Sequence, residues 1–170
     1  MRYASIIFGA AAVALAVPAP GFAAAPAQQA TGKGLILVPL SLVRIDDLDF
    51  GSVVPSASLG VVTINASTGA RTLAGGVTGV PSAAGNRAYF AGAGTPSQQV
   101  IMTMNPPAQL TSPASDTITV LGLSFDGSAI RTIDPATRVF YVGVGGSVQI
   151  NANQAEGIYT ATFDVTANYL

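Results

Sequence analysis

The sequence of 170 residues contains no cysteine and no histidine. Without cysteine, no disulfide can cross-link the fold, and no thiolate can act as a nucleophile or a metal ligand. Without histidine, imidazole-base catalysis, the Ser-His-Asp triad and most zinc sites are excluded. We therefore expect a protein that is not an enzyme, holds no cofactor or metal ion, and depends on packing for its stability.

Charge is also scarce, because only 9% of the residues are charged and Lys33 is the only lysine. A nucleic-acid-binding surface needs clustered Lys and Arg, so we expect no nucleic acid as a partner. The absence of tryptophan leaves few aromatic platforms for sugars. What is abundant is apolar residues, at 49%, together with 19 glycines and 11 prolines. This composition is typical of a β-rich, turn-rich secreted domain.

The N-terminus predicts a signal peptide over Met1–Ala23, with Arg2 followed by an apolar run from Ile6 to Val17. That run is too short to cross a bilayer as a helix, and no later run is longer, so the mature chain is expected to lack a membrane span. Ala24–Gly34 contains no large apolar residue and predicts a flexible leader. Residues 35–170 then form the folded domain.

After the leader, short apolar segments alternate with residues that favour turns, and no window shows sustained helical periodicity. The turn segments include Asn65–Gly69, Pro106–Pro107, Asp126–Gly127 and Gly145–Gly146. This spacing predicts an all-β protein, an antiparallel sandwich or a small barrel. The predicted strands are Leu35–Ile45, Val61–Ile64, Ala88–Ala91, Gln99–Met104, Ile118–Phe125, Arg138–Val144, Val148–Ile150 and the terminal strand from Gly157.

The terminal strand carries the clearest pattern. Its alternate residues place one set of apolar side chains on a single face, namely Tyr159, Ala161, Phe163, Val165, Ala167 and Tyr169. Burying each larger member is worth roughly 1.5–3 kcal/mol, so the end of the chain is predicted to be a core strand whose function is strand pairing.

Other candidate sites have simpler interpretations. Asp46, Asp47 and Asp49 could supply oxygens to a calcium ion, but the expected pattern of spaced acids with a closing glutamate is missing. We interpret this segment as a solvated corner with Leu48 and Phe50 pointing inward.

Gly143–Gly146 is interpreted as a β-turn, because no phosphate-binding motif surrounds it. In the pairs Tyr89–Phe90 and Phe140–Tyr141, one ring should face the core and the other solvent.

The terminal strand resembles the C-terminal strand of chaperone–usher pilus subunits in two features. Tyr169 is the penultimate residue, and Gly157 is the fourteenth from the end. Separately, Pro39–Leu42, Asp47–Gly51, Gly60–Ile64 and the ending from Gly157 together resemble an exported, fimbria-like bacterial family described as a domain of unknown function.

The pilin resemblance implies an immunoglobulin-like β-sandwich that lacks one strand, which a partner supplies by β-augmentation. The implied partners are a periplasmic chaperone, other pilus subunits and an outer-membrane usher. The implied location is the periplasm and then a fibre on the cell surface. The residues implied to line the partner-facing strand are Gly157, Tyr159, Phe163, Val165 and Tyr169.

The segment that this chain would itself donate is less clear. Ala24–Lys33 offers only alanines as apolar residues, so the candidate donor residues are Leu35, Leu37, Leu40 and Leu42. If Leu35–Leu42 is donated to a neighbour, we expect a structural subunit of a fibre with a missing strand; otherwise the domain is complete without a partner. Two alternatives stay open at this point: a self-complete sandwich that binds through loops such as Val77–Asn86, and a small outer-membrane barrel.

Overall fold

The computed structural model describes residues 28–170, so the predicted signal peptide and the first residues of the leader lie outside the described part of the chain. Residues 28–35 are exposed and form neither strand nor helix. The compact unit covers Ile36–Leu170. Among residues 28–170, no helix is long and apolar enough to cross a membrane.

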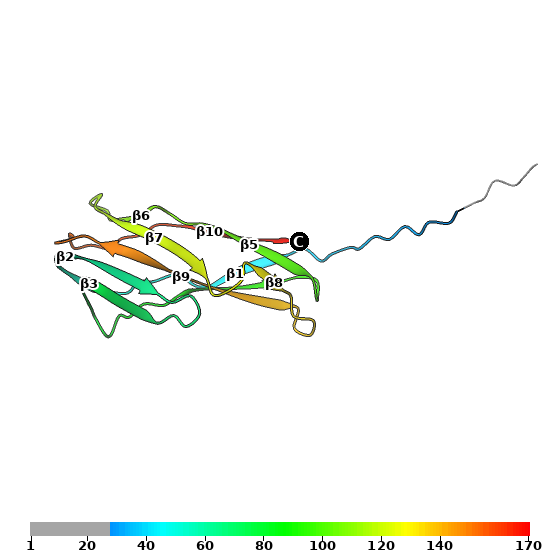
Figure 1. The fold of residues 1–170 in the computed structure, drawn as a ribbon, viewed down its shortest axis with the longest axis horizontal. Coiled ribbons are helices and arrows are strands. Elements are labelled where there is room, and N and C mark those ends of the chain that lie inside the picture. The colour runs from blue at the N-terminus through cyan, green and yellow to red at the C-terminus, as the bar shows by residue number, and fades with distance from the viewer. Residues whose placement is uncertain (1–27) are drawn as a thin grey trace, which may run out of the picture. The chain divides into compact units, whose positions relative to one another are not determined.

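The compact unit is built from strands that pair only in the antiparallel sense, in two sheets (Figure 1). The prediction of an all-β antiparallel sandwich is confirmed. The large sheet contains β1 (Ser41–Asp46), β2 (Val53–Ile64), β3 (Arg71–Gly79), β4 (Ala88–Ala93), β6 (Gln109–Thr111), β7 (Thr117–Phe125) and β9 (Val139–Ile150). The small sheet has the order β10 (Asp164–Tyr169), β5 (Gln99–Asn105) and β8 (Ile130–Thr132).

β9 organises the large sheet, because it is long enough to pair with three other strands. Its Val144 pairs with Ala88 of β4 and with Phe125 of β7, so these two strands lie on opposite edges of β9. β4 follows the first half of one edge, and β2 follows the second half from Gly146 onward. β2 and β3 therefore extend the sheet at the end that β8 does not reach (Figure 1).

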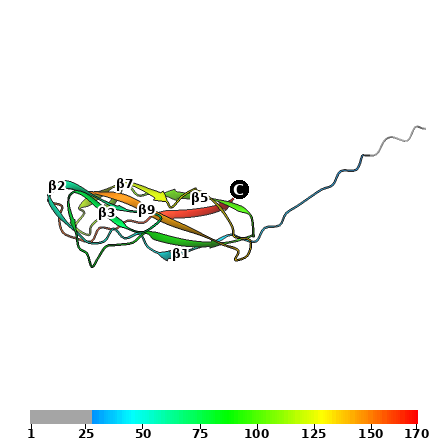
Figure 2. The same cartoon turned by 60° about the horizontal axis from the view of Figure 1, so that its bottom comes forward.

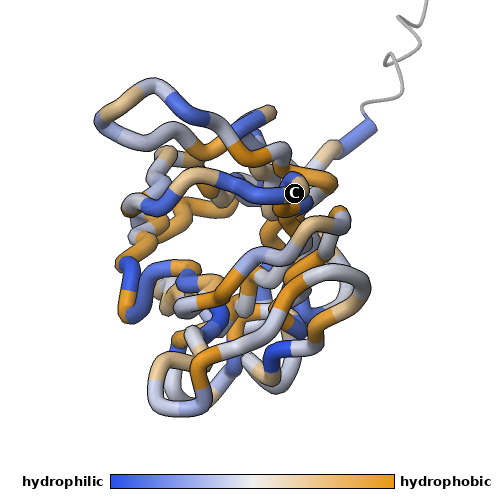
Figure 3. The backbone as a smooth tube through the Cα atoms, turned by 90° about the vertical axis from the view of Figure 1, so that its left-hand side faces the viewer, coloured by the Kyte–Doolittle hydropathy of each residue, from blue (hydrophilic) through white to orange (hydrophobic). Residues whose placement is uncertain are grey.

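The core consists of two hydrophobic clusters that differ in how they are covered. The first cluster lies between the two sheets, with Phe90, Phe140 and Val142 from the large sheet and Val100 and Met102 from the small sheet. The second cluster comes from the large sheet alone, and its buried members are Val62, Ile118, Val148 and Ile150. Seen end-on, hydrophobic segments occur in both layers (Figure 3). The small sheet thus covers only half of the inner face of the large sheet.

The prediction of a β-turn at Gly143–Gly146 is wrong, because β9 runs through these residues without a break. The glycines serve close packing instead. A Cβ atom at Gly145 would collide with the carbonyl oxygen of Ile64 and with the backbone of Ala66. The two segments predicted as Arg138–Val144 and Val148–Ile150 are therefore one strand.

Other boundaries also differ from the predictions. The first strand begins at Ser41 and not at Leu35, and the last begins at Asp164 and not at Gly157. β3 was not predicted, because its sequence contains three glycines and few large apolar residues. The short strands β6 and β8 were also missed, since three residues are too few to show a period.

Several local predictions are confirmed. Asn65–Gly69 is a turn in which the Gly69 N–H donates to the Asn65 carbonyl at 2.8 Å. Leu48 packs against the first cluster and Phe50 against the second. In the aromatic pairs, Phe90 and Phe140 are buried, whereas the rings of Tyr89 and Tyr141 stack on the opposite face at 5.6 Å.

The first cluster predicts a strong contrast between two isoleucines at the same edge of the small sheet. Ile133 is fully buried, and Ile130 is 45% exposed. Replacing Ile133→Ala should lower the free energy of unfolding by about 2–5 kcal/mol, because a cavity remains between the sheets. Ile130→Ala should cost much less. Urea denaturation of both variants checks this, and similar losses would contradict the burial that the structure assigns.

Candidate functional site

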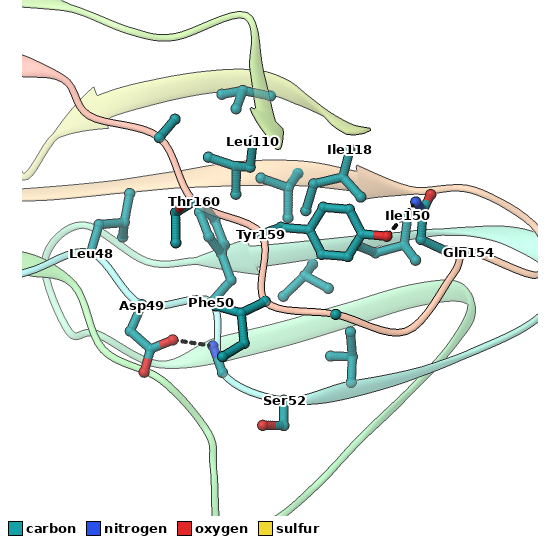
Figure 4. A pocket seen from close by; sticks show the side chains of 18 of the residues that line it. Leu48, Asp49, Phe50, Ser52, Leu110, Ile118, Ile150, Gln154, Tyr159 and Thr160 are labelled. Atoms are coloured by element: carbon teal, nitrogen blue, oxygen red, sulfur yellow. Dashed lines mark hydrogen bonds between the residues drawn. The ribbon is translucent and has the colours of Figure 1, made fainter. Parts of the chain in front are cut away.

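An open groove lies over the second cluster, where the small sheet does not cover the large one. Its cavity volume is about 730 Å³. The floor is apolar and comes from strands of the large sheet, with Val62, Ile118, Val120, Val148 and Ile150. The two walls are residues 48–55, which run into the start of β2, and residues 154–163, which precede β10 (Figure 4).

The first wall, residues 48–55, is held in place from outside the groove. The backbones of Asp49 and Asn86 exchange two hydrogen bonds of 2.9 Å. The Arg71 guanidinium donates to the carbonyls of Ser52, Val80 and Ala83 at 2.9–3.0 Å. These bonds join the wall to the 80–86 loop, so the wall cannot easily collapse into the groove.

A glycine makes this junction possible. Gly85 has a φ of 78°, and a Cβ atom there would collide with the carbonyl oxygen of Asp49. Only glycine adopts this left-handed conformation without cost and also allows the two backbones to approach so closely. Phe50 and Leu48 are thereby presented toward the groove (Figure 4).

The second wall, residues 154–163, leads into β10. The hydroxyl of Tyr159 donates to the Ala155 carbonyl at 2.7 Å and accepts from the Gln154 amide at 2.9 Å, so the ring leans over the second cluster (Figure 4). Thr160 exchanges two backbone hydrogen bonds of 3.0 and 3.1 Å with Thr111, the last residue of β6. Ile158 lines the groove with 78% of its surface exposed.

Within residues 28–170, β10 has one paired edge and one free edge, because it is the outermost strand of the small sheet and has β5 as its neighbour (Figure 2). In an antiparallel strand, the N–H and C=O groups of successive residues point to opposite edges. Leu170, which directly follows β10, donates its N–H to Gln99 at 3.0 Å, so the even-numbered residues face β5. The odd-numbered residues, including Val165 and Ala167, therefore direct their backbone groups to the free edge.

The groove and the segment that carries the free edge meet at Phe163, which lines the groove and also packs against the first cluster. The side chains of Phe163, Val165, Ala167 and Tyr169 pack against the first cluster, and all are only half-buried. Upstream, the amide N–H of Ala161 makes no hydrogen bond within residues 28–170. An unpaired edge thus runs along an incompletely covered apolar layer, which is an arrangement that an added strand would complete.

Tyr169 fastens the far end of this edge to the start of the compact unit. Its hydroxyl donates to the Val38 carbonyl at 2.7 Å and accepts from the Thr95 N–H at 2.8 Å. The Val38 N–H in turn donates to the Thr95 hydroxyl at 2.8 Å. The chain therefore enters the compact unit beside the residue with which β10 ends.

Of the predicted partner-facing residues, the structure places Gly157, Tyr159 and Phe163 at the groove, whereas Val165 and Tyr169 lie outside its lining and pack against the first cluster. Val165 and Tyr169 lie in β10, and Phe163 directly precedes it. Tyr159 belongs to the second wall, and Gly157 is exposed at the groove. The larger part of the groove, its floor, was not predicted. Alternating apolar residues such as Ile118 and Val120 look the same in sequence whether another strand covers them or not.

The four candidate donor leucines are placed differently from one another. Leu35 is 70% exposed, and Leu37 is half-buried. Leu40 and Leu42 pack against the first cluster of their own domain, and Leu42 pairs with Gly92 in the ladder between β1 and β4. Half of the proposed donor segment is therefore engaged in this fold.

The acidic corner beside the groove forms local contacts. Arg44 pairs with Asp47 at 2.7 Å, and a carboxylate oxygen of Asp49 accepts the Gly51 N–H at 2.7 Å. In the described part of the chain, no three acidic side chains are close enough to hold a metal ion together. The corner fixes the entry into the first wall.

The fold and its groove define the class of protein: an antiparallel β-sandwich with an open apolar groove, in which the outermost strand of the smaller sheet has one edge that is unpaired within residues 28–170. The chain belongs to the family described as Domain of unknown function (DUF4402), whose model matches residues 40–169. This match extends from the residue before β1 to the end of β10. No curated protein and no solved structure matches the chain.

The hydrogen bonds of Tyr169 generate a prediction about the free edge. Tyr169→Phe removes two hydrogen bonds and leaves the Thr95 N–H without its acceptor, so the free energy of unfolding should fall by about 1–2 kcal/mol. Tyr141→Phe is the matched control, because the Tyr141 hydroxyl makes no protein hydrogen bond within residues 28–170 and its ring is 53% exposed. Equal urea midpoints for the two variants would contradict the role given to Tyr169.

Proposed function

We propose that the protein is a structural subunit of a pilus or fimbria-like surface fibre, completed by a β-strand that a partner chain donates. The observation that carries this proposal is that an unpaired strand edge and an uncovered apolar groove occur side by side. In the part of the chain that the structure describes, the backbone groups on the free edge of β10 have no partner strand, and no strand covers the apolar groove that begins at Phe163. One added strand would remove both.

The physical gain from such a strand has two parts. Main-chain hydrogen bonds to the odd-numbered residues of the free edge would fix the strand, and side chains at alternate positions would enter the groove. Each large apolar side chain transferred from water into the groove is worth roughly 1.5–3 kcal/mol. Main-chain hydrogen bonds and buried side chains therefore both contribute to the affinity, and the side chains at alternate positions set the register.

The free edge also lacks the usual protection against pairing. Exposed edge strands in stable monomers are commonly blocked by proline, lysine or an inward-pointing charge. β10 contains neither proline nor lysine, and its one charged residue, Asp164, lies at its start. An edge so poorly protected, next to an apolar groove, supports a role in strand pairing.

The assembly that follows is directional. Each subunit would receive a strand in the groove and contact the next subunit through a different surface, which gives an open fibre and not a closed ring. In this proposal the chain is exported to the periplasm, a chaperone covers the groove there, and an outer-membrane usher exchanges the chaperone for another subunit.

Proline at the free edge tests the proposal. Ala161→Pro removes an N–H that makes no hydrogen bond within the described chain, so the free energy of unfolding should change little. Strand uptake should be lost, because proline cannot donate to an incoming strand. In material sheared from producing cells, the wild type and the control Ala161→Ser should give a ladder in unboiled denaturing gels that collapses on boiling. The proline variant should not.

A second variant keeps the test decisive if proline disturbs folding. Ile158→Asp places a charge at the groove on a side chain that is already 78% exposed, so folding should be preserved. Ile130→Asp, in β8 and outside the groove, is its control. A normal ladder from a folded Ala161→Pro or Ile158→Asp variant would overturn the proposed function.

A further inference from the structure

The groove demands large side chains from the strand that fills it. Its floor is lined by Val62, Ile118, Val120, Val148 and Ile150, and its cavity volume is about 730 Å³. Protein interiors are packed without voids of this size, and a strand that presents only methyl groups would leave most of the cavity empty. A filling strand therefore needs several large apolar residues at alternate positions.

The N-terminal segment of this chain does not meet that demand. From Ala24 to Gly34 its apolar residues are alanines and one proline. Once the predicted signal peptide Met1–Ala23 is removed, as export in the proposed function requires, the first large apolar residues are the four from Leu35 to Val38. A second copy of this chain could therefore offer large side chains to the groove only from the very end of its leader.

Those four residues are too few and too close to their own domain. Val38 is bound through its N–H to Thr95 and through its carbonyl to Tyr169. This leaves Leu35, Ile36 and Leu37, which span about 10 Å when fully extended. On one face of a strand they present at most two large side chains, those of Leu35 and Leu37. Inserting these residues into the groove of a second copy would also bring the compact units of the two copies into collision.

We infer that the strand that fills the groove comes from a different protein, as an extended segment with at least three large apolar side chains at alternate positions, and not from a second copy of this chain. The inference rests on the proposed function and narrows it. The chain accepts a strand but does not donate one to its own kind. It therefore joins a fibre of mixed composition and forms no homopolymer.

Two peptides of equal length test this inference. The first is residues 24–38 of this chain. The second carries Gln29→Val, Thr31→Leu and Lys33→Val, which extend the alternation of Leu35 and Leu37 toward the N-terminus without a break. Both are labelled and titrated against the full exported chain, refolded from denaturant so that no partner strand is bound. Fluorescence anisotropy gives the dissociation constants.

The substituted peptide should bind at least tenfold more tightly than the native one, and Ala161→Pro in the chain should weaken its binding by tenfold or more. Equal affinities for the two peptides, or a boil-sensitive ladder formed by the purified chain alone, would overturn the inference and leave the proposed function standing. Failure of both peptides to bind would overturn both. Equal binding of the substituted peptide to the proline variant would show that it binds outside the groove, against the inference.

Discussion

The structure depends on the fact that the small sheet covers only one of the two hydrophobic clusters on the inner face of the large sheet. The large sheet presents a continuous apolar inner face along β2, β7 and β9, but the strands of the small sheet lie over only one of its two clusters. Over the other cluster, the cover consists of two wall segments with a cavity between them. This incomplete cover accounts for three features: the free edge of β10, the half-burial of its inward side chains and the exposure of Ile158.

The walls are as informative as the cavity. A groove left open by accident would be expected to close by collapse of its flexible borders, since that would bury apolar surface. Here the Arg71 guanidinium and the Gly85 junction hold the first wall outward, and the bonds of Tyr159 and Thr160 hold the second. The open state is thus built into the fold by polar contacts, which supports its being a site and not a packing defect.

Sequence periodicity predicted the fold class well and the groove poorly. Alternation identified the terminal strand and the inward set of Phe163, Val165 and Tyr169, because a period of two depends only on which face is apolar. It could not show that the face is only partly covered, since the floor residue Ile118 has the pattern of any core strand. In sequence alone the glycines of β9 predict a turn, because the 64–66 backbone that they contact so closely belongs to residues distant in sequence.

The junction of Val38, Thr95 and Tyr169 gives the domain a defined mechanical entry point. A force applied to the N-terminal segment loads the hydrogen bonds of Val38. One of these bonds is donated by the hydroxyl of Tyr169, the last residue of β10. Tension applied at the start of the chain is therefore shared between β1, which follows directly, and the strand that borders the groove. Such a force would therefore act on the free edge of β10 before it acted on the first hydrophobic cluster.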